Sequence, residues 1–228
     1  MKLLAIDTSS LACSVALQHE GGIAERHEEQ EREHTRLLMP MIRAVLGEAK
    51  LGAESLDAVV LGNGPGSFIG MRIAASVAQG IAHGAGLQIM PVSSMAAVAA
   101  QVFLESDCDE VVVAQDAHMG EVYLGAWRRG AGDRPIVLLP ERLHGQVPVE
   151  GLDTAGACVR AAAGFGWQRY PALLAANEDR VGNRSPVLYP RARHLLPLAA
   201  DAPAIDPADV VPAYLRSTVA KTPAGPGS

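Results

Sequence analysis

With 228 residues, of which 49% are hydrophobic and 19% are charged, the chain is long enough for one large domain or two small ones and too apolar to be disordered. Its formal net charge of −6 argues against a protein that grips nucleic acid alone, because such proteins neutralise phosphates with a basic face. The cysteines Cys13, Cys108 and Cys158 are widely spaced and odd in number, so we expect reduced, buried thiols in a cytoplasmic protein. No run of eighteen apolar residues occurs, and we expect no membrane span.

The first half of the chain alternates strand and helix patterns. Three short apolar or alternating runs come first, and the turn-prone HEGG between two of them predicts an antiparallel meander. A helix, a strand, a second helix, another strand and a third helix follow, which predicts three antiparallel strands extended by parallel ones. The predicted strands cover residues 2–7, 13–18, 22–30, 51–62 and 87–93, and the predicted helices cover 34–49, 67–85 and 93–106.

A second cycle of the same kind begins near residue 106. Three strand-like runs open it, at 109–117, 121–130 and 136–143. The later chain is rich in Pro, Gly and Arg, with a further strand expected at 151–159 and short helices expected at 171–177 and 185–196. We therefore expect an α/β protein of two lobes with mixed sheets, the second lobe being degenerate. The predicted division is an N-terminal lobe at 1–106, a C-terminal lobe at 107–219 and a flexible tail at 220–228.

The stretch GNGPGSFIGMR at 62–72 joins an apolar run to an Ala-rich helix. A strand, a glycine-rich turn and a helix N-terminus make a natural anion site, because free backbone N–H groups point outwards there. However, the spacing is neither G-x-x-x-x-G-K-[ST] nor a dinucleotide fingerprint. Ser67 is a good N-cap, and Gly62, Gly64 and Gly66 permit the positive φ that a tight turn requires. A structural turn is favoured, with Gly64 and Gly66 kept as candidates for a vestigial cofactor site.

Asp7, Thr8 and Ser9 end the first predicted strand, where a metal or phosphate ligand sits in many α/β folds. A turn that closes the strand explains the same residues, and one carboxylate without a second acid or a lysine is a weak signal. His27 and His34 lie seven apart in a charged segment that is typical of a solvated surface. No zinc spacing, nucleophile elbow or H-E-x-x-H motif occurs. We therefore expect no catalytic and no metal residue, and Asp7, Thr8 and Ser9 join the vestigial candidates.

Two helices carry more apolar or small surface than one sheet needs. The apolar residues of 34–49 spread over about 200° of the circumference, whereas a surface helix needs a stripe of little over 100°. The helix from Ser67 carries many alanines, which let another helix approach closely. Both features favour a subunit interface. The predicted partner interface consists of Leu37, Leu38, Met39, Met41, Ile42, Val45, Ser67, Phe68, Met71, Arg72, Ala75 and Ser76.

Several motifs together resemble one family. They are MKLLAIDTS at the start, HTRLLMPMI, GNGPGSFIGMRI, DAHMGEVY at 116–123 and PAYLR at 212–216. This set resembles the TsaB (YeaZ) family of bacterial tRNA threonylcarbamoyladenosine biosynthesis proteins. The resemblance is close over residues 1 to about 125 and loose over 130–205. It departs from the family at His118, where arginine is more common.

The resemblance implies the two-lobed, ribonuclease-H-like fold of sugar kinases, heat-shock ATPases and actin. It also implies a non-catalytic scaffold that heterodimerises with the catalytic paralogue TsaD and recruits the P-loop ATPase TsaE. On this interpretation ATP, ADP and metal belong to the partner subunits, tRNA binds only through the complex, and the isolated chain could form a homodimer. TsaD holds a metal with histidines of V-H-H-M-E-G-H. The matching stretch here is VSSMAAV, with Ser94 and Val98 at the ligand positions, which implies no metal site.

Two alternatives remain open. The first is an ATP-binding enzyme of the same superfamily, with Asp7 near a metal and the glycine-rich loop on phosphate. The second is a glycoprotease-type peptidase, against which the lack of a nucleophile–base motif and of metal-ligand histidines argues.

Overall fold

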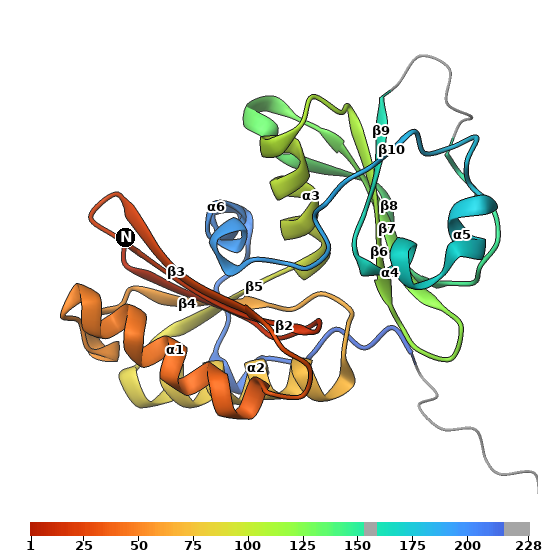
Figure 1. Cartoon of the computed structure of the whole chain (residues 1–228). Helices are drawn as coiled ribbons and strands as arrows, with labels where there is room; N and C mark the ends of the chain where they lie inside the picture. The colour runs from red at the N-terminus through yellow and green to blue at the C-terminus, as the bar shows by residue number, and fades with distance from the viewer. Residues whose placement is uncertain (153–158, 217–228) are drawn as a thin grey trace, which may run out of the picture.

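The computed structural model describes residues 1–152 and 159–216, which form two lobes, each built on a five-stranded mixed sheet (Figure 1). The first sheet has the order β3-β2-β1-β4-β5. Its strands are β1 (Leu3–Asp7), β2 (Ala12–His19), β3 (Gly22–Glu29), β4 (Ala58–Gly62) and β5 (Gln88–Val92). β1 to β3 are antiparallel, whereas β4 runs parallel to β1 and β5 parallel to β4. The predicted meander extended by parallel strands is therefore confirmed.

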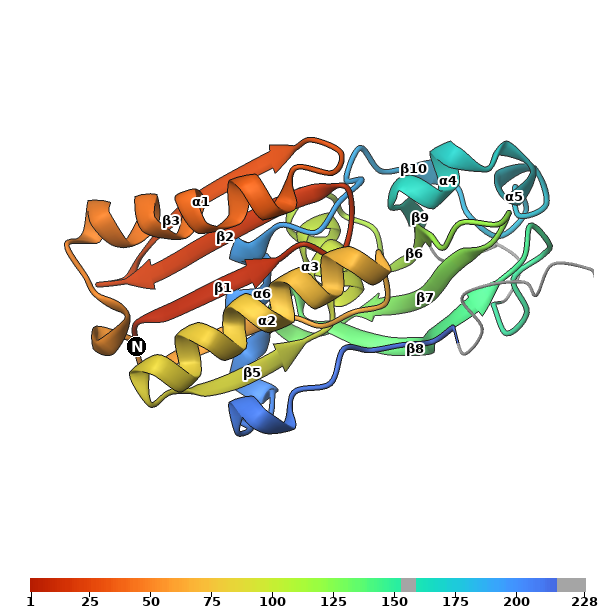
Figure 2. The same ribbon diagram turned by 90° about the horizontal axis from the view of Figure 1, so that it is seen from below.

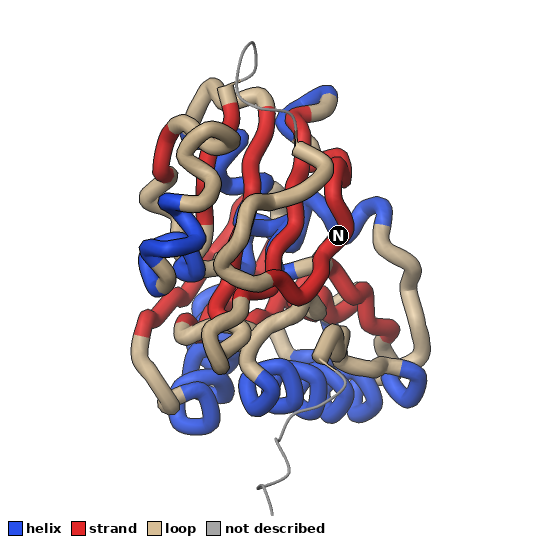
Figure 3. Tube along the Cα trace, turned by 90° about the vertical axis from the view of Figure 1, so that its right-hand side faces the viewer, coloured by secondary structure: helices blue, strands red, loops and turns tan. Residues whose placement is uncertain are grey.

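Helices cover both faces of the first sheet. α1 (His34–Ala49) and α2 (Phe68–Ala85) lie side by side across one face, as Figures 1 and 2 show. The other face packs against α3 (Ser94–Glu105) and α6 (Leu195–Leu198). Strand β1 is consequently buried along its whole length, which explains why it is a continuous apolar run. Figure 3 shows α1 and α2 along the bottom of the molecule, beneath the strands.

The second sheet repeats the topology of the first, but its two parallel strands, β9 and β10, are shorter than their counterparts β4 and β5. Its order is β10-β9-β6-β7-β8, with β6 to β8 antiparallel and β9 and β10 added in parallel. These strands are β6 (Glu110–Asp116), β7 (Val122–Arg129), β8 (Pro135–His144), β9 (Arg160–Ala163) and β10 (Asn183–Arg184). The helices of this lobe, α4 (Phe165–Arg169) and α5 (Pro171–Ala175), are single turns. The two-lobed α/β fold with a degenerate second lobe is thus confirmed.

Short 3₁₀ helices complete the described structure. They are η1 (Ala53–Ser55), η2 (Ala131–Asp133), η3 (Ala192–His194), η4 (Ala199–Asp201) and η5 (Pro207–Asp209). Two predicted bounds are corrected: the strand expected at 51–62 starts only at Ala58, and the helix expected at 185–196 is replaced by η3 and α6, which together cover 192–198. The strand expected at 151–159 falls mostly on residues outside the described chain, and the following strand begins at Arg160.

The chain returns to the first lobe near its end. Leu195 and Leu196 pack on the first sheet, Val210 joins its core under α1 and α2, and Ile205 pairs with Ile89 of β5 through two backbone hydrogen bonds of 2.9 and 3.0 Å. The division into lobes at residue 106 stays a prediction. Residues 192–210, which follow that boundary in the sequence, nevertheless pack against the first lobe. The predicted tail at 220–228 lies outside the described residues.

Cys13 and Cys108 are buried and carry free thiols, and burial raises the pKa of Cys13 to about 12. Cys158 lies outside the described chain. Within the ranges that the structure describes, no helix has the length and apolar character needed to cross a membrane.

Candidate functional site: the packed glycine loop and the inter-lobe cleft

The glycine-rich loop between β4 and α2 is packed from both sides. A Cβ atom on Gly66 would lie 2.1 Å from the carbonyl oxygen of Ser9, and one on Gly64 would lie 2.6 Å from the backbone nitrogen of Ser94. The expectation of positive φ was wrong, because Gly62, Gly64 and Gly66 all have ordinary φ values. These glycines are required because other backbone segments approach closely, not because the loop turns left-handed.

Three backbone donors of this loop, at Asn63, Gly64 and Ser67, are engaged within the protein. The N–H of Asn63 donates to the carbonyl of Val92 at 2.7 Å, and that of Gly64 donates to the Ser94 hydroxyl at 3.2 Å. The N–H of Ser67 donates to the Ser9 carbonyl at 2.6 Å. Ser67 is the N-cap of α2, as predicted, since its hydroxyl accepts from the N–H of Gly70. These three N–H groups already have acceptors within the protein, so they are not free to bind an anion.

Asp7 is fully buried at the end of β1. Its carboxylate accepts hydrogen bonds from the Ser9 N–H at 2.9 Å, from the Ser9 hydroxyl at 2.8 Å and from the Ser94 hydroxyl. Burial raises the pKa of Asp7, and these hydrogen bonds oppose the shift only in part. The Thr8 hydroxyl donates to the Gly70 carbonyl at 2.7 Å. The structure therefore brings Asp7, Thr8 and Ser9 together with the glycine loop, as one interlocked cluster.

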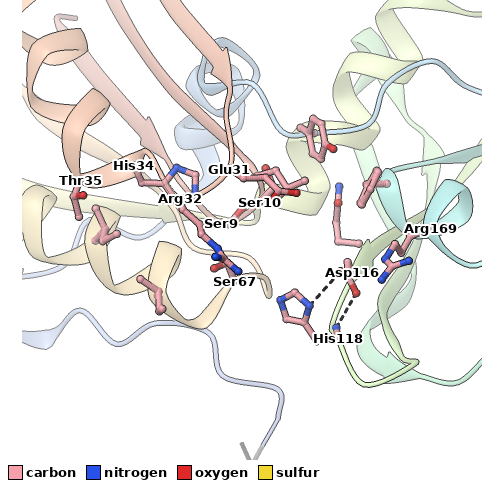
Figure 4. A pocket seen from close by; sticks show the side chains of 16 residues that line it. Ser9, Ser10, Glu31, Arg32, His34, Thr35, Ser67, Asp116, His118 and Arg169 are labelled. Carbon is pink, nitrogen blue, oxygen red and sulfur yellow. Dashed lines mark hydrogen bonds and ion pairs between the residues drawn. The ribbon is translucent and has the colours of Figure 1, made fainter.

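A cleft of about 910 Å³ lies between the lobes, in front of this cluster (Figure 4). The first lobe contributes Ser9, Ser10 and Ser67, and the second contributes Asp116, His118 and Arg169. The volume is within the range of small-molecule sites. Among the described residues, no group of three or more His, Cys, Asp or Glu side chains is placed to hold a metal ion.

The second-lobe wall of the cleft is held by Asp116. Its carboxylate accepts from the backbone N–H of His118 at 2.8 Å and from the Tyr170 hydroxyl at 2.8 Å, and it lies 3.3 Å from Nδ1 of His118. On the first-lobe side, His34 starts α1, and burial lowers its pKa. Sequence reasoning missed Asp116 and Tyr170, although the DAHMGEVY motif that contains Asp116 was a signal.

The predicted partner interface divides into buried and outward-facing residues. Six of its side chains are at most 7% exposed and fill the core of the first lobe, so they offer no surface to a partner: Leu38, Met41, Ile42, Val45, Met71 and Ala75. The remaining six lie at least partly at the surface: Leu37, Met39, Ser67, Phe68, Arg72 and Ser76. Whether a partner contacts these stays a prediction.

The surface of α2 also carries apolar side chains that the sequence did not single out. Ile69 is 70% exposed, and Ile73 and Val77 are partly exposed on the same helix; Ile69 and Ile73 also line the inter-lobe cleft. Near the start of α2, the Arg72 guanidinium lies 3.7 Å above the Phe68 ring and donates to the Tyr214 hydroxyl at 2.9 Å. Tyr214, from the C-terminal PAYLR motif, therefore extends this face.

Comparisons with known proteins agree with the fold and the motifs. The family model of TsaD, tRNA N6-adenosine threonylcarbamoyltransferase, matches residues 10–139. The tRNA threonylcarbamoyladenosine biosynthesis protein TsaB of Escherichia coli K12 is 34% identical over 96% of both chains. The Haemophilus influenzae protein of that name is 33% identical over 96% of this chain and 95% of its own. The solved structure of YeaZ from Pseudomonas aeruginosa is 34% identical, with a TM-score of 0.83 over 94% of this chain and 99% of that chain.

The fold and these matches define a two-lobed α/β protein related to the threonylcarbamoyltransferase family. Within that class, the chain belongs to the TsaB family of tRNA threonylcarbamoyladenosine biosynthesis proteins. Membership in this family supports a part in the biosynthesis of that modified nucleoside.

Proposed function

We propose that the chain is a non-catalytic scaffold subunit in tRNA threonylcarbamoyladenosine formation, which acts by pairing with TsaD and recruiting the ATPase TsaE. In this proposal TsaD and TsaE supply the metal and the nucleotide sites, and tRNA is bound only by the assembled complex. The observation that carries the proposal is the outer surface of the α1–α2 pair. There, Ile69 and Ser76 of α2 are exposed and Phe68 of α2 and Met39 of α1 are partly exposed, although both helices also contribute buried side chains to the core beneath them.

This surface suits the helices of a second protein. Small residues such as Ser76 and Gly80 allow another helix to approach closely, and both are exposed on α2. Partly exposed Ile73 and Val77 supply apolar area along the same side. An apolar helical face with nothing packed on it is typical of a protein contact site.

The packed glycine loop supports the scaffold over the ATP-binding alternative. Backbone atoms of Ser9 and Ser94 lie against Gly66 and Gly64 of the loop, and its donors at Asn63, Gly64 and Ser67 are engaged. Titration of the isolated protein with ATP and Mg²⁺ in a calorimeter is therefore expected to show no tight binding and no hydrolysis. Tight binding accompanied by hydrolysis would contradict the scaffold proposal.

The pairing is tested by placing a charge on the exposed face of α2. Ser76→Glu buries an unpaired carboxylate in the proposed contact and is expected to weaken TsaD binding by about 2–4 kcal/mol. Met39→Glu tests α1 in the same way. Calorimetric titration against TsaD from the same organism measures the loss, and the melting temperature of the isolated variant shows that the fold is intact.

A matched control introduces the same charge elsewhere. Ala172→Glu lies on an exposed helical position of the second lobe and is expected to bind TsaD as tightly as the unaltered chain. If Ser76→Glu and Met39→Glu both bind normally, the contact with TsaD lies away from α1 and α2.

A further inference from the structure

The C-terminal part of the described chain, residues 211–216, runs from the first lobe to the second. At the first lobe it is held by Asn63 of the glycine loop. The Asn63 side-chain amide donates to the carbonyl of Val211 at 3.0 Å, and its carbonyl accepts from the N–H of Ala213 at 3.1 Å. The Asn63 side chain thus pairs with the backbone of the segment through one donor and one acceptor, as the backbone of a neighbouring β-strand does.

The middle of the segment is held by α2. The Tyr214 hydroxyl accepts from Nε of Arg72 at 2.9 Å, and the Tyr214 and Phe68 ring centroids are 5.6 Å apart. Since Arg72 stacks on Phe68, the three side chains form one cation–π and aromatic cluster. The segment is thereby attached to the same end of α2 that the proposed partner contact uses.

The far end of the segment is held by the second lobe. The guanidinium of Arg216 donates to the carbonyl of Ala117 at 3.1 Å and to the Glu121 carboxylate at 2.7 Å, and it contacts the Met119 sulfur at 3.5 Å. The Arg216 side chain is only 15% exposed, so salt screens this ion pair less than it would a surface pair. One side chain thus contacts both ends and the tip of a single turn.

That turn has an unfavourable backbone conformation. His118, Met119 and Gly120 have φ values of 59°, 56° and 83°, so three successive residues are left-handed, two of which carry side chains. Residues that carry a side chain rarely adopt the left-handed region of φ and ψ. A turn with two of them persists only where surrounding contacts stabilise it. The turn also presents His118 to the inter-lobe cleft. A second pocket, of about 190 Å³, lies between Met119 and the Phe68–Tyr214 pair.

We propose that residues 211–216 are a strap that ties the glycine loop and α2 to the left-handed turn at 118–120. The strap holds that turn in place and thereby sets the wall of the cleft that carries His118. It also connects the N-terminal end of α2 to the cleft, so that a structural change at one of them alters the other. This inference does not depend on the identity of the partner, because the strap is complete within this chain.

Amide hydrogen exchange, followed by NMR on the whole chain, tests the strap. Three amides of the turn are hydrogen-bonded: Ala117 N–H to the Glu121 carbonyl, Glu121 N–H to the His118 carbonyl, and His118 N–H to Asp116. Arg216→Ala is expected to raise their exchange about tenfold or more, because it removes charge-assisted hydrogen bonds from a strained turn. Amides in the middle of β6 and β7 are expected to keep their rates.

A second variant tests whether the two ends are coupled. Asn63→Ala removes both bonds to the first-lobe end and is expected to raise exchange at Ala213 and also at His118 and Glu121. An increase confined to Ala213 would overturn the coupling. Unchanged turn amides in Arg216→Ala, or an equal increase throughout the second sheet, would overturn the strap's hold on the turn.

Two further variants keep the test interpretable. Arg134→Ala removes an ion pair to Asp201 that does not touch the turn, and it is expected to leave the turn amides unchanged. A rise there in this control would overturn the proposal, because any lost ion pair would then have the same effect. If Arg216→Ala does not fold, Glu121→Gln replaces it, since it removes the charge and keeps an acceptor of similar shape. About a threefold rise at the same amides is then expected, and no rise would overturn the proposal.

Discussion

Replacing Gly70 by alanine is expected to destabilise the chain, whereas the same replacement at Gly80 in the same helix is expected to stabilise it. A Cβ atom on Gly70 would lie 1.9 Å from the backbone oxygen of Thr8, and the Gly70 carbonyl accepts a buried hydrogen bond from the Thr8 hydroxyl at 2.7 Å. The overlap therefore has to be relieved by moving backbone, and the hydrogen bond is lost with it. Together these effects cost about 3 kcal/mol or more. At Gly80 nothing lies within 4 Å, and alanine gains about 1 kcal/mol from its higher helix propensity.

Thermal and urea unfolding of the isolated chain, followed by circular dichroism, measure both changes. A loss of about 3 kcal/mol lowers the melting temperature by roughly 6–12 °C in a protein of this size, and a gain of about 1 kcal/mol raises it by roughly 2–4 °C. Equal effects at the two positions, or a neutral Gly70→Ala, would show that Gly70 is not required by the close approach of Thr8. The contact between the first turn of α2 and the backbone of Thr8 would then be loose enough to admit a methyl group.

Three further outcomes are expected of the isolated chain. Because burial raises the pKa of Asp7 above 3.8, stability should fall as pH rises from about 3.8 through the raised pKa, and Asp7→Asn should flatten that part of the profile; an unaltered profile would show that Asp7 is not desolvated. Burial lowers the pKa of His194 from 6.5 to about 4, so stability should fall as pH drops through that interval. His194→Asn should make this loss of stability smaller. Part of the loss should remain, because burial also lowers the pKa of His34. Identical acid unfolding of His194→Asn and the unaltered chain would contradict this. Finally, the isolated chain should bind tRNA with a Kd no tighter than about 10⁻⁴ M at physiological salt, and sub-micromolar binding with a steep salt dependence, measured by fluorescence anisotropy, would be the opposite result.

The first lobe was predictable because its local signals agree with its tertiary structure. The helix at 34–49 has an apolar period with clear limits, and Ser67 caps the next helix as its residue type indicates. In the second lobe such signals fail. Strand β9 contains three alanines and β10 has two residues, so pairing with neighbouring strands defines them more than their own side chains do. The helix α4 was not predicted because its five residues are too few to show a helical period.

The sequence predicted individual residues of the candidate site, but it did not predict how the fold arranges them. Asp7 and the glycine loop were recognised as neighbours of strand ends, but the sequence does not distinguish a glycine needed for close approach, such as Gly66, from one needed for positive φ, such as Gly86 at 68°. The outward margin of α1 was also undecided, because periodicity gives the width of an apolar arc and not its direction. The cleft combines residues from both lobes, and only the folded chain brings Ser67 near His118.

We propose that this chain is required for the reaction through its contact with TsaD. Reconstituted formation of threonylcarbamoyladenosine on tRNA with TsaD, TsaE and an activated threonylcarbamoyl donor, with each protein omitted in turn, tests this requirement. The account predicts that omitting this chain abolishes modification, that Ser76→Glu fails to restore it, and that Ala172→Glu restores it fully. Undiminished modification without this chain, or modification by this chain without TsaD, would contradict the account.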